Sequence, residues 1–453
     1  MKKKYGRGKY SNSEHIDDDE ETINIKSTST RKRRKRNFFF NTNKYIYIIP
    51  ISIFIFLLLF FRIIYKLNYN SNNTDENNIS NNTTNITFDT TEELNKSRIV
   101  TKDQAIDNAI SYISNCASGK LVNNETLKIV DNPLISVVIP CYFCQKYIKG
   151  ALRSIQNQNF YDVDIIIVND DLDNNSINTL KELANEDPRI EIIYNNKRMG
   201  ILYTRSIGVL HAKGEFVTTL DQDDFFSEED VFDYLYKVAK GENIDILVFK
   251  ILEGYDYANK ARYKDNNNNK LPTNLTLSQP ELSCHTIMKD DKIFQSQDIY
   301  IWGKFYRSLV YKSAINLLGK DRYSVFMEWE EDVIMSFLIV NVANSYKFIE
   351  KYGYFHLIHG GTPTSRVANT KKNYYRLIKV EIFFDFTKKE CKMAPVKELI
   401  EMKNIFAKSL DDETKNYLER LIKKIFGLNY IENKYKEQIK NVYRDYFPNI
   451  NNF

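Results

Sequence analysis

After residue 131 the chain alternates between two hydrophobic patterns. Short apolar runs of strand length are followed by stretches in which apolar residues recur every three or four positions. The strand-like runs are "LISVVIP", "VDIIIVND", "IEIIYNN", "EFVTTLDQDD" and "IDILVFKIL". Because these five runs are separated by helical stretches such as "KYIKGALRSIQNQ", they predict an α/β domain with a mostly parallel sheet over residues 131–365. Such a sheet binds ligands at the carboxyl ends of its strands.

From residue 366 onward the pattern is mainly that of amphipathic helices. In "KNYYRLIKVEIFFDF" and "KNYLERLIKKIF" the apolar residues recur at helical spacing. We expect Leu418, Leu421, Ile422 and Ile425 to be core residues, and the intervening lysines to form a solvated face. The pattern predicts a C-terminal helical region over residues 366–453.

An apolar segment near the N-terminus predicts a membrane anchor. Residues 45–61, "YIYIIPISIFIFLLLFF", are uncharged, and as a helix they would rise about 26 Å, close to the ~30 Å hydrocarbon core of a bilayer. The preceding "RKRRKR" belongs in the cytosol by the positive-inside rule. We predict a cytosolic basic tail (1–44), a transmembrane helix (45–65) and a lumenal catalytic domain. This is a single-pass type II membrane protein, and the short span favours the Golgi or ER.

Residues 66–130, between the anchor and the α/β domain, are predicted to form a flexible lumenal stalk. The first part is rich in Asn and lacks hydrophobic periodicity. It contains several N-x-[ST] motifs, which are acceptors of N-glycosylation in the lumen. These motifs agree with the orientation that the basic tail indicates.

Charge and cysteine content limit the partners. The formal charge is +5, but residues 1–44 hold thirteen Lys or Arg against six Asp or Glu, a local +7, which leaves 5 − 7 = −2 for the rest. Because the body of the protein is not basic, no nucleic-acid partner is expected. The five cysteines form no dense disulfide framework, and their odd number leaves at least one thiol unpaired within the chain.

The strongest chemical pattern is "LDQDDFF", directly after the fourth predicted strand. Asp221 and Asp223 are two positions apart and would point to the same side of an extended chain. Two carboxylates at this place can bind a divalent cation that takes its remaining ligands from phosphate and water. A strand-end turn, or a cap for the helix near Ser227, is the alternative explanation.

Two further residues are weak candidates on their own. Asp170 ends the second strand and can accept a hydrogen bond from a base or ribose. Arg205, on the helix before the fourth strand, can bind a diphosphate with its guanidinium fork. An Asp at a strand end is more often a turn residue, and an Arg on a helix is more often a solvated charge.

Five segments, in order, resemble the motifs of glycosyltransferase family 2 over residues 135–365. They are "ISVVIPCYFCQKYIKGALRSIQNQNF", "DIIIVNDDLDNNS", "NNKRMGILYTRSIGVLHAKGEFVTTLDQDDFF", "IYIWGKFYRSLVYKSAI" and "WEEDVIMSFLI". The resemblance implies a GT-A fold, which has a Rossmann-like, mostly parallel sheet. It assigns residues as follows: Tyr142 and Asp170 to the nucleotide base, Arg205 to the diphosphate region, Asp221 to the ribose side and Asp223 to the metal.

The turn after the first strand, "PCYFC", is the place where the resemblance puts the nucleotide base. Pro140 and Tyr142 match the family's turn, whereas Cys141 and Phe143 replace its usual Thr and Asn. Cys141 and Cys144 form a C-x-x-C pattern, for which a redox pair or half of a zinc site is the alternative. We expect the two cysteines to be incidental, because the motif does not start a helix and a second pair of zinc ligands is lacking.

The resemblance places the catalytic base in "MEWEEDVIMS". An inverting transferase needs one ionised base to accept the proton of the acceptor hydroxyl. Asp332 is the favoured base, with Glu331 beside it, although acidic residues are also common at helix starts because of the dipole.

Four aromatic residues are candidates with structural alternatives. Trp302 and Trp329 can line an acceptor pocket or belong to the core. His356 and His359 lie where the resemblance allows contacts with the diphosphate, and each can equally be an ordinary loop or core histidine.

The sequence therefore predicts an inverting glycosyltransferase that uses manganese or magnesium. The expected donor is a nucleotide-diphosphate sugar, in particular a UDP-sugar, and the acceptor is a hydroxyl of a glycan, protein or lipid. One alternative is a membrane-anchored pseudoenzyme or nucleotide-sugar-binding module, because "NDDLDNN" replaces the family's usual "DDGSTD". A haloacid-dehalogenase-like phosphatase, which also uses an Asp-x-Asp motif, is a weaker alternative.

Overall fold

The computed structural model describes residues 102–122, 127–255, 264–265, 276–278, 288–289, 292–293, 300–359, 368–386, 393–406 and 410–453. All of these residues belong to one compact unit that starts at Thr87. The predicted tail (1–44) and anchor (45–65) lie outside the described residues. Within the described ranges, no helix is long and apolar enough to cross a membrane.

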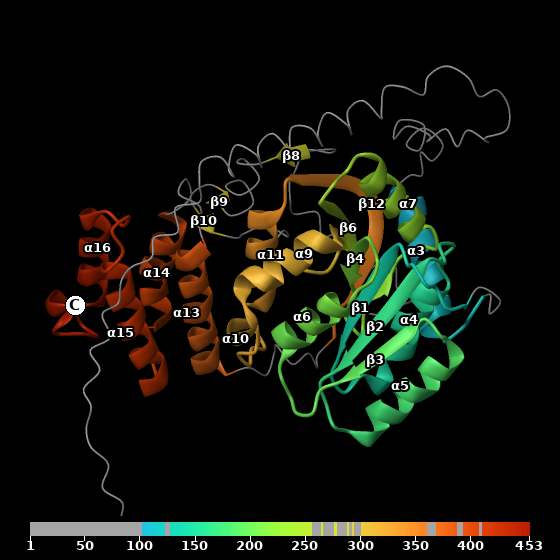
Figure 1. Cartoon of the computed structure of the whole chain (residues 1–453), viewed down its shortest axis with the longest axis horizontal. Coiled ribbons are helices and arrows are strands. Elements are labelled where there is room, and N and C mark those ends of the chain that lie inside the picture. Colours follow the sequence, from blue (N-terminus) through green and yellow to red (C-terminus); the bar gives the residue numbers. More distant parts are fainter. Residues whose placement is uncertain are drawn as a thin grey trace, which may run out of the picture. The chain divides into compact units, whose positions relative to one another are not determined.

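A mixed, mostly parallel sheet lies at the centre of this unit (Figure 1). The five predicted strands are present as β1 (Ile135–Cys141), β2 (Val163–Asn169), β3 (Ile190–Tyr194), β4 (Phe216–Thr219) and β6 (Ile246–Gly254). Strands β3, β2, β1 and β4 are neighbours in that order and run parallel. The prediction of a mostly parallel α/β sheet is therefore confirmed.

The sheet also contains strands that were not expected. Strand β11 (Lys304–Arg307) lies between β4 and β6 and is antiparallel to both. Strand β12 (Ser345–Leu357) pairs with β6 in parallel and with the short β5 (Phe225–Phe226) in the antiparallel direction. β11 is missed because two of its four residues, Lys304 and Arg307, are charged, so that it shows no apolar run.

The strand order reverses at β1, which sets the place of the site. From β1 the sheet continues to β2 and β3 on one side and to β4 on the other. A doubly wound sheet opens a crevice at such a switch point, beyond the carboxyl ends of the two strands. The turn after β1 and the "LDQDD" segment after β4 both lie there.

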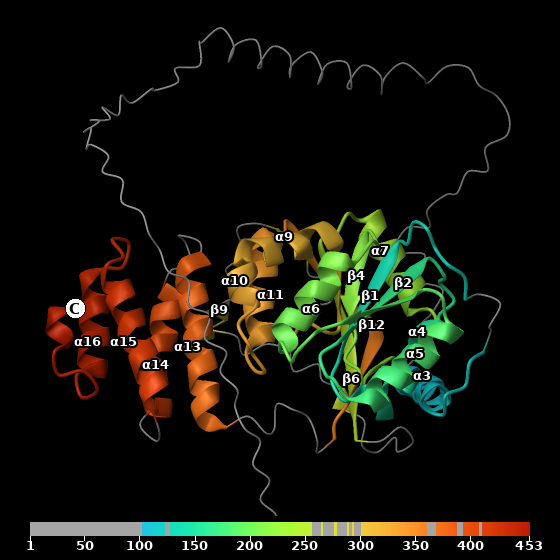
Figure 2. The same cartoon turned by 60° about the horizontal axis from the view of Figure 1, so that its bottom comes forward.

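Helices cover the two faces of the sheet (Figure 2). Val138 of β1 packs in one cluster with residues of α6 (Ile201–His211), α9 (Ser308–Leu318) and α11 (Glu331–Val342). Its neighbours Val137 and Ile139 pack in another cluster, with residues of α4 (Ile148–Gln156), α5 (Asn174–Glu186) and α7 (Val231–Gly241). The two clusters separate because side chains alternate between the faces of a strand.

Helix α6 lies unusually close to β1. A Cβ atom at Gly208 would come 2.4 Å from Cγ1 of Val138, so only glycine permits this approach. Arg205, about one turn earlier on α6, is thereby held against the edge of the sheet.

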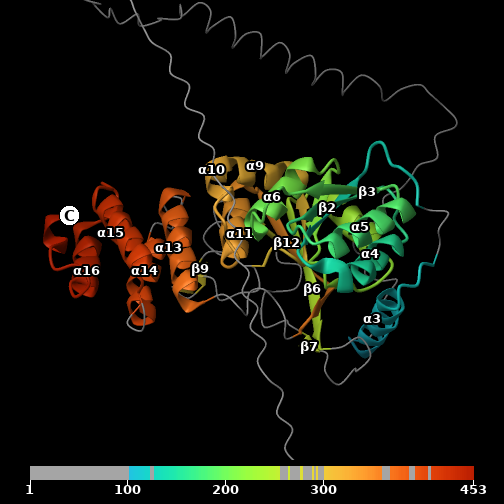
Figure 3. The ribbon, with the colours of Figure 1, turned by 90° about the horizontal axis from the view of Figure 1, so that it is seen from below.

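The folded unit begins before residue 131, in the segment predicted as stalk. Lys102–Ala117 form helix α3, which lies beside α4 (Figure 3). Ile106, Ala109, Ile113 and Cys116 are buried in a cluster with Phe355 of β12. The predicted boundary at residue 131 therefore lies too far along the chain. The helical spacing of these apolar residues is the signal that was missed.

The C-terminal region contains helices α13 (Asn369–Phe386), α14 (Met393–Phe406), α15 (Asp412–Phe426) and α16 (Asn433–Tyr443), side by side (Figure 2). They share a core that includes Leu418, Leu421, Ile422 and Ile425, so the prediction for these four side chains is confirmed. Helix α13 also packs against α11, with the rings of Phe383 and Phe337 4.5 Å apart.

Candidate active site

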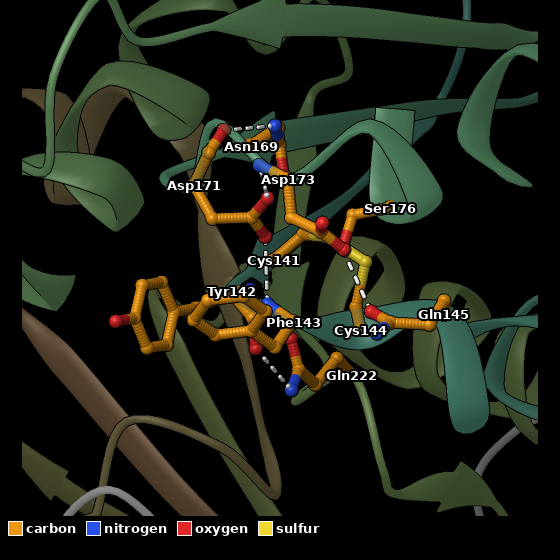
Figure 4. Close-up of a disulfide and its surroundings, with 10 residues drawn as sticks. All are labelled: Cys141, Tyr142, Phe143, Cys144, Gln145, Asn169, Asp171, Asp173, Ser176 and Gln222. Atoms are coloured by element: carbon orange, nitrogen blue, oxygen red, sulfur yellow. Dashed lines mark hydrogen bonds between the residues drawn. A yellow bond between two sulfur atoms is a disulfide. The ribbon is translucent and has the colours of Figure 1, made fainter. Parts of the chain in front are cut away.

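The turn after β1 is closed by a disulfide between Cys141 and Cys144 (Figure 4). Both cysteines are buried, and Cys116 is the free cysteine among the described residues. The expectation that the C-x-x-C cysteines are incidental is therefore wrong. The sequence could not decide it, because pairing depends on how closely the turn brings the two Cβ atoms together.

Two neighbouring segments hold the residues inside this turn (Figure 4). The Phe143 N–H donates to Oδ2 of Asp171 at 2.6 Å. The Tyr142 N–H donates to Oε1 of Gln222 at 2.7 Å, and Gln222 Nε2 donates back to the Tyr142 carbonyl at 3.0 Å. Gln222 is the middle residue of "DQD". It was not predicted as a site residue, because a side-chain amide does not indicate metal binding. It connects the β1 turn to the segment after β4.

The Tyr142 ring is partly covered by the side chains of Arg198 and Phe143. The Arg198 guanidinium carbon lies 4.2 Å from the centre of this ring, and the Phe143 ring meets it edge-on at 4.7 Å. Phe143 has a left-handed backbone (φ 50°) and is 51% exposed. Pro140, in contrast, is buried within β1, opposite Val168. Tyr142 and Phe143 are thus the residues of the turn that reach the crevice.

Asp170 is occupied by contacts within the protein. Its Oδ1 accepts from Asn195 Nδ2 and from the Met199 N–H, both at 2.7 Å, and its Oδ2 accepts from the Gly200 N–H at 2.8 Å. Asp170 therefore holds the loop that leads into α6. This is the role of a turn residue, which was the alternative explanation for Asp170. Its assignment to the nucleotide base stays a prediction.

Arg205 is the centre of a buried ion cluster. Its Nη2 donates to Oδ1 of Asp221 at 2.7 Å, and its Nη1 donates to Asp332 and, at 3.3 Å, to Oε1 of Glu331. The side chain is 4% exposed. Burial acts to lower the pKa of Arg205, but the three carboxylates outweigh it and raise that pKa above its usual value. The guanidinium thus donates to these three acids. The contact of Arg205 with a diphosphate remains a prediction.

The two acids at the start of α11 both have raised pKa values. Burial, reinforced by Asp332 and opposed by Arg205, raises the pKa of Glu331 to about 8. Burial also raises the pKa of Asp332, and its charged contact with Arg205 opposes this. A carboxyl with a pKa near 8 is mostly protonated at neutral pH. Burial thus favours the protonated form of both acids, and both of them accept a hydrogen bond from the Arg205 guanidinium.

The "DQDD" segment forms a turn instead of an extended chain, since the Asp224 N–H donates to the Asp221 carbonyl at 3.1 Å. The expectation that Asp221 and Asp223 share one side of a strand is therefore wrong, because β4 ends at Thr219. Asp223 Oδ2 lies 2.7 Å from Nε2 of His359. Burial and the carboxylates of Asp224 and Asp221 raise the pKa of Asp223 to about 6.

Asp224 and His356 hold the end of β12 in place. Asp224 accepts from the Leu357 N–H at 2.9 Å and from the Tyr354 hydroxyl at 2.7 Å, and it lies 3.2 Å from Nδ1 of His356. Burial acts to lower the pKa of His356, but Asp224 outweighs it and raises that pKa to about 9. His356 is therefore an imidazolium paired with Asp224, and His359 is the histidine that reaches the "DQD" turn.

The two tryptophans belong to different surroundings. Trp302 is 6% exposed, and its ring stacks on those of Tyr300 at 4.4 Å and His356 at 5.0 Å. Trp329 is half-buried, and the Arg376 guanidinium lies 4.5 Å from its ring centre. Trp302 is thus a core residue, which was the alternative to an acceptor pocket. Trp329 is covered by side chains of α13. Tyr300 is the half-buried end of the Trp302 stack.

These contacts bring the sequence candidates together at one place. Gln222 joins the Tyr142 turn to the "DQD" segment, Arg205 joins Asp221 to Asp332, and His359 joins Asp223. In the part of the chain that the structure describes, no group of three or more His, Cys, Asp or Glu side chains is arranged to hold a metal ion. Of the predicted ligands, Asp223 lies beside His359, and a carboxylate oxygen such as that of Asp223 suits Mn²⁺ or Mg²⁺. A ligand phosphate and water would have to complete the coordination.

A family model and several curated proteins are similar to parts of this chain. Residues 136–297 match the family described as "Glycosyl transferase family 2". An uncharacterized glycosyltransferase of Haemophilus influenzae is 23% identical over 224 residues, which cover 48% of this chain and 80% of that protein. The glycosyltransferase GlyG of Streptococcus pneumoniae is 29% identical over 115 residues, covering 25% of this chain and 38% of that protein. The chain thus spans most of the first relative and less than half of the second.

One solved structure is similar over a large part of the chain. The crystal structure of S. aureus TarS 1-349 in complex with UDP-GlcNAc is 15% identical, with a TM-score of 0.45, and the similarity covers 70% of this chain and 91% of that one. This likeness is too distant to say anything about ligands.

Proposed function

We propose that this chain, whose residues 136–297 match the model of glycosyltransferase family 2, is an inverting, metal-dependent glycosyltransferase of the GT-A type. Its donor is a nucleotide-diphosphate sugar, in particular a UDP-sugar, and its acceptor is a hydroxyl of a glycan, protein or lipid. One observation carries the proposal: the Arg205 guanidinium joins Asp221 of the "DQD" turn to Asp332 of α11. The donor residues and the base are therefore neighbours.

The donor occupies the crevice beyond β1 and β4. Tyr142 and Phe143 offer aromatic faces to the base, as protein aromatics commonly do for nucleotides. Asp221 lies on the ribose side, and Asp223 with His359 lies beside the diphosphate. Asp170 stabilises the loop beside the donor by accepting hydrogen bonds from the backbone N–H groups of Met199 and Gly200.

Asp223 and His359 are the residues that would hold Mn²⁺ or Mg²⁺. Burial and the neighbouring carboxylates raise the pKa of Asp223 to about 6, and a bound cation would relieve the repulsion between the carboxylates. When bound, the cation stabilises the negative charge of the departing diphosphate.

Asp332 acts as the base. It accepts the proton of the acceptor hydroxyl; burial raises its pKa, and the contact with Arg205 opposes that rise. Glu331, with a pKa of about 8, is mostly protonated at neutral pH and is not suited to that role. A single base is sufficient for inversion, since the leaving diphosphate needs no general acid when its charge is neutralised.

The proposed location is the lumen of the Golgi or ER, behind a type II anchor at residues 45–65. The apolar segment and the basic tail support it, and so does the disulfide of the donor turn, because disulfides persist in oxidising compartments. If the chain faces the lumen, glycosidase treatment of the cell-made protein should lower its apparent mass. A band that does not shift counts against this orientation.

The function is tested with the purified full-length chain and a panel of UDP- and GDP-sugars, with and without Mn²⁺. We expect metal-dependent donor hydrolysis or transfer that Asp223→Ala abolishes and the surface substitution Asp233→Ala leaves unchanged. Full activity of Asp223→Ala would contradict the proposal. Donor binding without turnover would instead identify a nucleotide-sugar-binding module.

A further inference from the structure

We propose that the C-terminal helix α13 positions the catalytic base Asp332 through Lys379, by an ion pair with Glu330. This inference rests on the proposed function, because Asp332 is its base. It gives the C-terminal helical region a role in catalysis, as a positioning element that makes no contact with the substrate.

Glu330 has an unusual backbone at a critical place. It is in the left-handed conformation, with φ 71° and ψ 0°, which a residue with a Cβ adopts at a cost. Its carbonyl accepts the first hydrogen bond of α11, from the Ile334 N–H at 3.1 Å. The direction in which α11 starts, and hence where Asp332 points, depends on Glu330 keeping this conformation.

The Glu330 side chain is held by α13. Its Oε2 lies 2.8 Å from Nζ of Lys379, and its Oε1 lies 3.8 Å from Nε of Arg376. The Glu330 side chain is 8% exposed and that of Lys379 is 9% exposed. Burial acts to lower the pKa of Lys379, but Glu398 and Glu330 outweigh it and raise that pKa. The pair is therefore charged and shielded from water, where electrostatic contacts are strong.

One face of α13 contacts two consecutive residues, Trp329 and Glu330. Lys372, Arg376 and Lys379 follow one another at four and three positions, so they lie on one side of the helix. Lys372 and Arg376 cover the Trp329 ring, at 5.5 and 4.5 Å from its centre, while Lys379 pairs with Glu330. Lys379 also binds Glu398 of α14, which ties this face to the rest of the C-terminal region.

The test compares two lysine substitutions in the full-length chain. Lys379→Met removes the charge and keeps the aliphatic stem. Lys424→Met is the matched control, because Lys424 of α15 also joins two helices through two acids of α13, Glu381 at 2.8 Å and Asp385 at 2.7 Å, away from α11. Transfer kinetics and hydrogen exchange of residues 328–336 are measured in both, and Lys379→Arg is the conservative rescue.

We expect Lys379→Met to lower kcat about tenfold or more with donor KM nearly unchanged, since small displacements of a catalytic group have effects of this size. Exchange of residues 328–336 should become faster. Lys424→Met should change neither, and Lys379→Arg should recover most of kcat. If Lys379→Met keeps its kcat and its exchange, or if Lys424→Met shows the same losses, the proposal is overturned.

A second pair of variants covers the case in which Lys379→Met does not fold. Glu330→Gly and Glu330→Ala both lose the ion pair, but only glycine adopts the left-handed backbone freely. Glu330→Gly should retain a higher kcat and slower exchange than Glu330→Ala, and equal values would refute the positioning role. A wild-type chain without transferase activity would refute the proposed function alone, because the exchange measurement still tests the positioning.

Discussion

The two ends of the candidate site are held in place by different physical means. At the donor end, the Tyr142 turn is closed by a disulfide and by hydrogen bonds from its backbone to Asp171 and to the neutral amide of Gln222. At the base end, Asp332 is held by a buried arginine among three carboxylates, and the preceding Glu330 by a buried lysine. The donor end should therefore respond to reduction, and the base end to charge substitution and pH.

Replacing the base should have the largest effect. Asp332→Asn cannot accept the proton of the acceptor hydroxyl, and we expect kcat to fall by about a thousandfold, within the usual range for a lost general base. Donor binding, measured by calorimetry, should persist because the β1 turn is untouched. The exposed Asp321→Asn serves as the control, and a variant Asp332→Asn with more than a tenth of the wild-type kcat would rule out this base.

Removing Arg205 should have the largest effect on stability. Arg205→Met leaves three carboxylates without their buried cation, and we expect the free energy of unfolding to fall by about 3–5 kcal/mol, as for other buried pairs that lose one partner. The half-exposed pair of Arg322 and Asp385 is the comparison, and Arg322→Met should cost about 1 kcal/mol or less. Urea denaturation measures both, and similar losses would mean that the Arg205 cluster is not special.

Opening the disulfide should act on the donor end alone. In Cys141→Ser/Cys144→Ser the turn keeps its hydrogen bonds to Asp171 and Gln222, so we expect donor KM to rise about fivefold, near 1 kcal/mol, with kcat unchanged. Cys116→Ser, at the free cysteine, should leave KM as it is. Tyr142→Ala should raise KM more than the double serine variant does, and the reverse order would mean that the sulfur atoms matter more than the ring.

The pH dependence of stability should be the most specific of these effects. The folded-state pKa of Glu331 is raised to about 8, so the folded state binds more protons than the unfolded state above the ordinary carboxyl pKa. The contribution of Glu331 is fully present below pH ~4.5 and is lost as the pH rises through about 8. Glu331→Gln should flatten the free energy of unfolding over this window. An unchanged slope would mean that Glu331 is ionised when folded.

Much of the fold follows from local patterns. The five apolar runs became strands because each carries enough β-branched residues to show its period, and the family motifs lie at their carboxyl ends. Helix α3 and strand β11 were not predicted for different reasons: the helical spacing of α3 lies in an otherwise polar segment, and two of the four residues of β11 are charged. For the site, Asp221, Asp223, Glu331 and Asp332 were identified from their positions, but their partners were not.

The sequence by itself determined the order of the strands, the family motifs and the identity of the acidic residues, because these depend on local spacing and side-chain chemistry. Only the tertiary structure decided what those residues touch. Arg205 and Asp332 are 127 positions apart and Lys379 and Glu330 are 49 apart in the chain, and no periodic pattern encodes contacts at such separations. The disulfide at "PCYFC" also depends on the path of the folded turn, since two cysteines pair only when the backbone brings them close.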